Sequence, residues 1–216
     1  EMIRLHYAYP SDFPYGILPV MARRKEVCKY LDIALQHIDD TVLDNMRRHI
    51  TAEETRRLLE RIRREVPGIH IRTTMMVGFP GEDDAAFERL VDFVKEQRFE
   101  RLGAFAYCEE DDTYAARNYD DSIPDEVKQA RLERLMSVQE EIATEVAASK
   151  VGKTLRVIID EYDDNMGRWI GRTEFDSPEV DCNVFVESDS ELAPGDIRNV
   201  TITDSEGFDL YGTVRL

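Results

Sequence analysis

A polar pair, Gln36-His37, follows a predicted strand over residues 30–35. Functional groups gather at the carboxyl ends of parallel strands, so this pair is well placed to contact a ligand. A loop histidine that hydrogen-bonds the backbone is an equally good interpretation of His37. The neighbouring sequence offers no nucleophile for His37 to activate, so a Ser–His or Cys–His mechanism has little support.

A second group of candidate residues lies on and after a predicted strand over residues 69–77. Arg72 and Thr73 are on this strand, and the turn Gly78-Phe79-Pro80-Gly81-Glu82 ends it. The glycines let the backbone approach a ligand closely, and the helix that follows presents free N–H groups. No Gly-Lys-Ser/Thr follows, so the turn is not a P-loop. Its acidic residues would repel phosphate, which favours a nucleoside-like ligand; a tight strand-to-helix connection explains the turn equally well.

Strand and helix patterns alternate over the first two thirds of the chain, which predicts parallel strands joined by crossover helices. Four such strands are too few to close a barrel of eight, so the sheet is either small and open or part of a larger barrel. The predicted strands cover 3–9, 30–35, 69–77 and 102–107, and the predicted helices cover 19–26, 41–48, 51–66 and about 83–97.

A helix over 124–150 separates this region from a different pattern. Five short strand candidates without a helix predict a small β-barrel of the oligonucleotide-binding (OB) kind. The strands are expected over 154–161, 168–173, 183–187, 196–203 and 207–215. We therefore expect two domains, residues 1–150 and 151–216.

The chain is strongly acidic, with 28 Lys and Arg against 45 Asp and Glu and a net charge of −17. Residues 151–216 hold six basic and 15 acidic side chains, a net charge of −9. Such a surface repels the phosphates of DNA and RNA and attracts basic partners, although solubility alone also explains it. No apolar run is long enough for a membrane span and no leader is evident, which favours a cytoplasmic protein.

An acidic stretch in the barrel region, with Asp176, Glu179 and Asp181, occupies a place where a nucleic-acid reader would carry basic residues. We expect these three carboxylates to be solvated and to bind a basic protein. Trp169 and Tyr211 could stack on bases, but such residues more often belong to a core.

Three cysteines, Cys28, Cys108 and Cys182, lie far apart and form no CxxC or CxxxCxxC motif. The sequence therefore predicts reduced thiols and no metal site of their own making.

Several segments, in this order along the chain, resemble the radical S-adenosylmethionine (SAM) methylthiotransferases. One departure is Ala34, where that family commonly has proline before Leu-Gln-His, and it leaves the polar pair in place. The segments are 3–10 (IRLHYAYP in single letters from residue 3), 30–38, 72–82, 101–107, 124–128, 131–136, 151–154 and 209–212.

The resemblance implies the second half of a radical SAM partial (βα) barrel followed by a TRAM β-barrel. It implies SAM and two 4Fe-4S clusters as cofactors of the full-length enzyme, and SAM binding near Gln36, His37, Arg72, Thr73 and the turn at 78–80. In this family a reduced cluster cleaves SAM to a radical that abstracts hydrogen, and a second cluster delivers methylthio. The family's cluster ligands have no counterpart here, and the chain begins with Glu1, so we expect an upstream portion to hold both clusters and this fragment alone to be inactive.

Two branches of the family differ in substrate. One modifies an adenosine of tRNA, and the other modifies the β-carbon of an aspartate in a small-subunit ribosomal protein. The charge of −9 on residues 151–216 favours the basic ribosomal protein over RNA. The stretch over 171–181 also resembles the ribosomal-protein branch, whereas the tRNA branch has a more basic loop there. The tRNA branch and a non-catalytic RNA-binding module stay open as alternatives, and steep salt dependence of RNA binding would distinguish the module.

Overall fold

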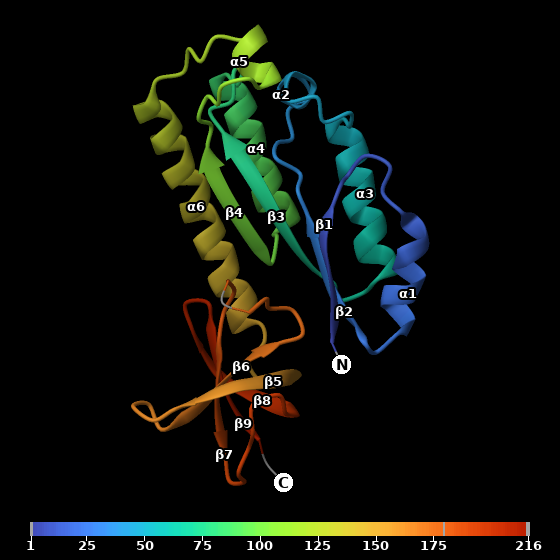
Figure 1. The fold of residues 1–216 in the computed structure, drawn as a ribbon, viewed down its shortest axis with the longest axis vertical. Coiled ribbons are helices and arrows are strands. Elements are labelled where there is room, and N and C mark those ends of the chain that lie inside the picture. The colour runs from blue at the N-terminus through green and yellow to red at the C-terminus, as the bar shows by residue number, and fades with distance from the viewer. Residues whose placement is uncertain (1, 179, 215–216) are drawn as a thin grey trace. The chain divides into compact units, whose positions relative to one another are not determined.

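The computed structural model describes residues 2–178 and 180–214, which form two compact units (Figure 1). The first unit runs from Ile3 to Ile142 and the second begins at Ala143. The division between these compact units falls inside the long helix α6 (Asp125–Ala148).

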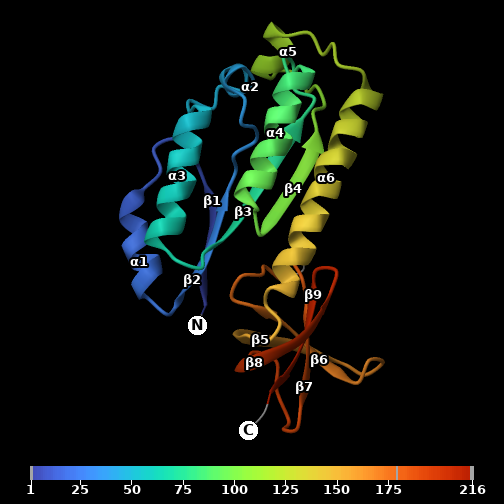
Figure 2. The ribbon, with the colours of Figure 1, turned by 180° about the vertical axis from the view of Figure 1, so that it is seen from behind.

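The first unit contains a four-stranded parallel sheet in the order β1-β2-β3-β4, as predicted. Figure 2 shows α3 and α4 in front of this sheet, and Figure 1 shows them behind it, so both helices cover the same face. The strands are β1 (Ile3–Ala8), β2 (Val27–Ile33), β3 (His70–Val77) and β4 (Arg101–Ala106). The helices are a 3-10 turn η1 (Tyr15–Ile17), α1 (Leu18–Arg23), α2 (Asp40–Asn45), α3 (Ala52–Glu65), α4 (Asp84–Gln97) and α5 (Tyr114–Asn118).

Side-chain caps fix where the crossover helices begin. Thr51 and Glu54 form the predicted capping box at the start of α3, each bonding the other's backbone N–H. Asp83 caps α4 through the N–H of Ala86 at 2.7 Å. These local signals explain why the helix positions follow from the sequence.

Alternation along β3 determines which residues reach the open face of the sheet. Ile71, Thr73, Met75 and Val77 are buried, whereas the residues between them are half-buried. Successive side chains of a strand point to opposite faces, so the buried set packs under the helices. The half-buried set, which includes Arg72 and Met76, lies on the other face.

The second unit is a closed barrel in the order β5-β6-β7-β9-β8, which agrees with the predicted OB-like fold. Val157, Val184, Val186, Val200 and Leu210 are among its buried core residues. Its strands are β5 (Thr154–Asp163), β6 (Arg168–Thr173), β7 (Val184–Ser188), β8 (Ile197–Glu206) and β9 (Asp209–Val214).

Close backbone packing explains two of the barrel glycines. A Cβ at Gly171 would lie 2.4 Å from the carbonyl oxygen of Ile158, and one at Gly212 would lie 2.5 Å from Val200 Cγ1. Neither position has room for a larger residue. None of the helices in the described ranges is long and apolar enough to cross a membrane.

Candidate functional site

A cavity of about 330 Å³ opens at the carboxyl end of β3, where α2 and α5 also lie (Figure 1). Its lining combines apolar surface with two arginines and two amides. The lining residues are Gln36, Asn45, Met46, Arg47, Arg48, Met76, Phe79, Tyr114 and Ala115. Of the predicted cofactor-binding residues, the cavity brings together Gln36 and Phe79.

Gln36 is held in an unusual backbone conformation with φ of 71°. Its N–H donates to the carbonyl of Thr74 at 2.9 Å, and its carbonyl accepts from the N–H of Met76 at 2.8 Å. The left-handed conformation is costly for a residue with a side chain, and these two bonds to β3 maintain it. The buried Oε1 atom of Gln36 has no hydrogen-bond partner among the described residues, so it is an acceptor available to a ligand.

His37 is fully buried, and both of its ring nitrogens are bonded. The N–H of Asp39 donates to Nδ1 at 3.0 Å, so the ring carries its proton on Nε2. Nε2 then donates to Glu82 Oε2 at 3.0 Å. His37 thus joins the loop after β2 to the turn after β3 and does not line the cavity.

Glu82 is a buried carboxylate at the centre of a hydrogen-bond network. Its Oε1 accepts from the N–H of Gly78 at 3.0 Å and from Arg131 Nη1 at 2.7 Å. Arg131 also donates to the carbonyl of Glu82 at 3.1 Å and to Asp84 Oδ1 at 2.7 Å. A buried charge needs such partners, so Arg131 of α6 compensates the charge of the Glu82 carboxylate.

The turn that contains Gly78 is closed by a lysine. A Cβ at Gly78 would lie 2.3 Å from Lys128 Cγ, and the residue has φ of 74°. Lys128 is 3% exposed, and its Nζ donates to Asp121 at 2.6 Å and to Asp125 at 3.3 Å. Although burial lowers the pKa of Lys128, the hydrogen bonds that Lys128 donates to both aspartates outweigh it and raise the pKa above its usual value.

Two further turn residues are held by Tyr107, which follows β4, and by Asn45 at the end of α2. The ring of Phe79 packs edge-on against Tyr107 with centroids 4.9 Å apart. The carbonyl of Pro80 accepts from Asn45 Nδ2 at 3.2 Å. These contacts hold the turn so that Phe79 forms part of the cavity wall.

Arg72 and Thr73 do not line the cavity. Thr73 is buried on the helix-covered face, where its Oγ1 accepts from the N–H of Leu35 at 3.4 Å. Arg72 shares a face of β3 with Met76 but precedes it by four residues, which is about 13 Å along a strand. Of the expected SAM-binding residues, Arg72 and Thr73 therefore do not join Gln36 in this cavity.

Two arginines and a tyrosine of the cavity were missed by the sequence analysis. The guanidinium of Arg47 lies 4.0 Å from the ring centroid of Tyr114, and that of Arg48 lies 4.3 Å from the centroid of Tyr9. Burial lowers the pKa of Arg48, which also donates to the carbonyl of Ala34. The position of Arg47-Arg48 in the connection after β2 is a signal that could have identified them, since such connections carry function in barrel-like folds.

Asp39 supports the site from the start of α2. Its Oδ1 caps the helix by accepting from Thr41 and Val42, and its Oδ2 accepts from Arg89 at 2.8 Å. Burial raises the pKa of Asp39, but the bonds from Arg89 and Val42 outweigh it and lower the pKa below 3.8.

The variant Asp39→Asn should therefore be less stable above pH 4, by at most about 1 kcal/mol, because it keeps a capping oxygen but loses the ion pair with Arg89. A carboxyl with a depressed pKa contributes stability above its unfolded pKa and loses it as the pH falls through its folded pKa. Urea unfolding between pH 3 and pH 7 should show a shallower acid limb for the variant. If stability fell with pH in parallel for the variant and the unaltered protein, the lowered pKa assigned to Asp39 would be contradicted.

The proposed partner-binding residues behave differently from expectation. Asp176 is 1% exposed and accepts a hydrogen bond from Thr173 Oγ1, so the expectation of a solvated carboxylate is wrong for it. Asp181 is half-buried and accepts from the N–H of Ser177 at 2.7 Å, which shapes the loop. Glu179 lies outside the described residues. Compact turns recruit Asp for such backbone bonds, and sequence alone does not distinguish them from surface charges.

The cysteines do not form a metal site. Cys28 is buried in β2, Cys108 is exposed after β4, and Cys182 belongs to the second unit. Within residues 2–178 and 180–214, no group of three His, Cys, Asp or Glu side chains is arranged to hold a metal ion. The residues present therefore do not fit an iron–sulfur cluster.

Comparisons with known proteins agree with this architecture. Residues 2–94 match the Radical SAM superfamily and residues 151–214 match the TRAM domain. Coproporphyrinogen III oxidase (HemN) from Escherichia coli, a radical SAM enzyme, aligns with a TM-score of 0.54 and 19% identity over 65% of this chain and 32% of that chain. That likeness shows the fold alone.

Proteins named ribosomal protein uS12 methylthiotransferase RimO are similar along almost the whole chain. The protein from Parabacteroides distasonis is 58% identical over 214 residues, which are 99% of this chain and 49% of that protein. The protein from Bacteroides fragilis is 56% identical over 215 residues, again 99% of this chain and 49% of that protein. The chain thus spans about half the length of these relatives.

The sheet, the barrel and the two matches define a radical SAM segment followed by a TRAM domain. Within that class the chain is similar along almost its whole length to the proteins named ribosomal protein uS12 methylthiotransferase RimO.

Proposed function

We propose that the protein containing this chain is a cytoplasmic radical SAM methylthiotransferase that adds a methylthio group to the β-carbon of an aspartate in ribosomal protein uS12. The observation that carries this proposal is the 54–58% identity over 99% of the chain to several proteins named for that activity. The acidic barrel supports a basic protein substrate over RNA or DNA, since residues 151–216 carry a net charge of −9.

The cavity after β3 has features that suit SAM. Met46, Met76 and Phe79 offer an apolar wall to a nucleoside, and Gln36 Oε1 offers an acceptor to an amino group. When bound, SAM supplies the one-electron chemistry of the family. The other predicted residues would position the loop after β2 and the turn after β3 without contacting SAM; these residues are His37, Thr73, Gly78 and Pro80. We assign Arg72 no role in SAM binding at this cavity.

The decisive experiment uses the full-length protein with reconstituted clusters, SAM, a reductant and purified uS12. Mass spectrometry of uS12 should find one methylthio group in place of one hydrogen on an aspartate. Bulk tRNA in a parallel reaction serves as the alternative substrate. A modified tRNA adenosine together with unmodified uS12 would overturn the proposal in favour of the tRNA branch.

The iron–sulfur clusters of the full-length enzyme, two in our proposal, would be held outside this chain. We therefore expect the 216-residue chain to bind only substoichiometric iron after anaerobic reconstitution and to be inactive, because Cys28 is buried and far in sequence from the other two cysteines. Iron analysis and EPR spectroscopy provide the measurement. A stoichiometric 4Fe-4S signal would contradict this expectation.

A further inference from the structure

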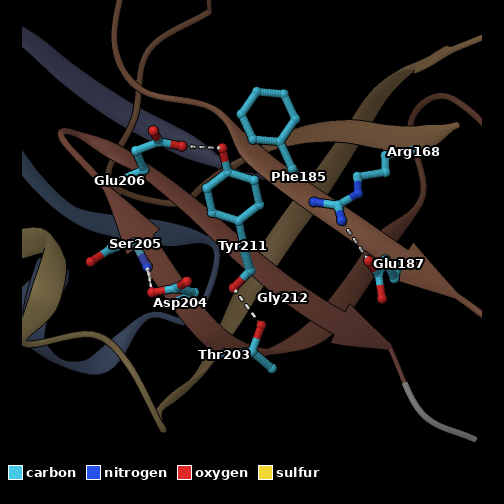
Figure 3. Close-up of a pocket in the computed structure, with 9 residues that line it drawn as sticks. All are labelled: Arg168, Phe185, Glu187, Thr203, Asp204, Ser205, Glu206, Tyr211 and Gly212. Carbon is cyan, nitrogen blue, oxygen red and sulfur yellow. Dashed lines mark hydrogen bonds and ion pairs between the residues drawn. The ribbon is translucent and has the colours of Figure 1, made fainter. Parts of the chain in front are cut away.

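A cavity that is not part of the proposed cofactor site lies on the outside of the barrel. Its volume is about 530 Å³, and aromatic and acidic side chains line it (Figure 3). The lining residues are Arg168, Phe185, Glu187, Thr203, Asp204, Ser205, Glu206, Tyr211 and Gly212.

Two aromatic rings form the floor of this cavity. Phe185 and Tyr211 pair across β7 and β9 and stack with centroids 5.2 Å apart at an angle of 29°. Their strand neighbours Val184, Val186 and Leu210 are buried in the core, so both rings belong to the outer face of the barrel. Half-exposed rings on an outer face are available to a partner.

Three carboxylates surround the rings. Glu206 accepts from the Tyr211 hydroxyl at 3.0 Å, and Glu187 pairs with Arg168 at 2.8 Å (Figure 3). Asp204 lies opposite Tyr211 just after an irregularity in the pairing of β8 with β9. Such irregularities redirect side chains, and this one is placed at the cavity.

The ring of Tyr211 already engages a cation. The guanidinium of Arg168 lies 5.5 Å from its centroid. Arg168 is also the single basic side chain of the lining, against three acidic ones. A carboxylate offers about four acceptor positions, so the bond from Tyr211 leaves Glu206 able to accept from a further cation.

We propose that this cavity binds a Lys or Arg side chain of a basic protein segment, with its stem or guanidinium over Tyr211 and its charge between Asp204 and Glu206. Cation–π contact and carboxylate pairing both favour such a side chain, and the carboxylates repel the phosphates of RNA. The identification of the segment with uS12 rests on the proposed function. The site replaces the stretch around Asp176 as the docking surface, because Asp176 is buried.

The test measures binding of purified uS12 to the 216-residue chain by calorimetry. The double variant Asp204→Asn/Glu206→Gln should bind about 5-fold more weakly or worse, which corresponds to the loss of one such cation site. The control variant Glu161→Gln/Asp164→Asn removes the same charge from exposed residues of the same barrel that do not line the cavity. It should change the affinity less than 2-fold.

A second pair of variants tests the aromatic floor. Tyr211→Leu should weaken binding of uS12, whereas Tyr162→Leu, which removes a tyrosine that is 46% exposed elsewhere on the barrel, should not. Circular dichroism confirms that each variant is folded. Addition of N-acetyl-arginine methylamide to the unaltered chain should shift the NMR signals of the Phe185 and Tyr211 rings.

The proposal would be overturned if the unaltered chain did not bind uS12, or if the cavity variants and the control variants lost the same affinity for uS12. It would also be overturned if the chain bound oligouridylate more tightly than uS12, with a steep salt dependence. Modification of uS12 by the unaltered full-length protein is a separate readout. Binding that depends on the cavity without modification would refute the proposed function alone, and modification without such dependence would refute the cavity alone.

Discussion

Replacing Arg131 by methionine should lower the free energy of unfolding by about 3–5 kcal/mol at neutral pH. The side chain of Glu82 has no exposed surface, and Arg131 is its cationic partner at 2.7 Å. Without Arg131 the carboxylate would remain buried with hydrogen bonds from His37 and Gly78 but without compensation of its charge. Urea unfolding followed by circular dichroism measures the loss.

A double variant separates the charge from the packing. Glu82→Gln combined with Arg131→Met removes both charges and should recover at least half of the stability lost in Arg131→Met. Arg134→Met serves as the control, since Arg134 pairs with Glu88 and both side chains are about half exposed. It should leave the unfolding midpoint nearly unchanged. Equal losses in the Arg131 and Arg134 variants would show that Glu82 does not depend on its partner.

Gly78→Ala should destabilise the first unit by about 2–5 kcal/mol. Two costs add up: the left-handed φ of 74° and the overlap of the new Cβ with Lys128 Cγ. The stem of Lys128 cannot move away without loss of its bonds to Asp121 and Asp125. Thermal and urea unfolding give the change in stability.

The chain offers matched controls for these two costs. Gly68 has φ of 81° with nothing within 4 Å of its Cβ position, so Gly68→Ala measures the backbone cost alone. Adding Lys128→Ala to Gly78→Ala should remove the overlap, and the double variant should lose less stability than the sum of the single variants. Equal losses of stability for Gly78→Ala and Gly68→Ala would mean that the Lys128 side chain moves aside without destabilising the fold.

The sequence predicted the elements better than the site, and particular residues show why. Thr51, Glu54 and the periodicity along β3 are local signals, so the helix start and the strand were predicted closely. Helix α5 was missed although Thr113 caps it, because its five residues carry no apolar stripe. Its Tyr114 was therefore missed, although it lines the cavity.

Long-range partners decided the roles of the candidate residues. Glu82 and Arg131 are 49 positions apart, and no local pattern indicates that one compensates the other. His37 and Gln36 are adjacent, yet His37 is fully buried and Gln36, whose backbone is in the left-handed region, lines the cavity. Asp176 shows the same limit in the barrel. The sequence suggested a surface carboxylate, whereas in the structure this carboxylate accepts a hydrogen bond from Thr173.

The division inside α6 affects how this chain can be cut into parts. Ala147 is 3% exposed and belongs to the barrel core, and Lys150 is 4% exposed with its Nζ 5.7 Å from the Phe175 ring centroid. Both precede residue 151, where the match to the TRAM domain begins. An expression fragment that starts at residue 151 would leave an apolar gap in the barrel, whereas one that starts at Ala143 would include the last turns of α6. The barrel core thus extends beyond the segment that its sequence match marks, and a transplanted barrel would need those helical turns to fill it.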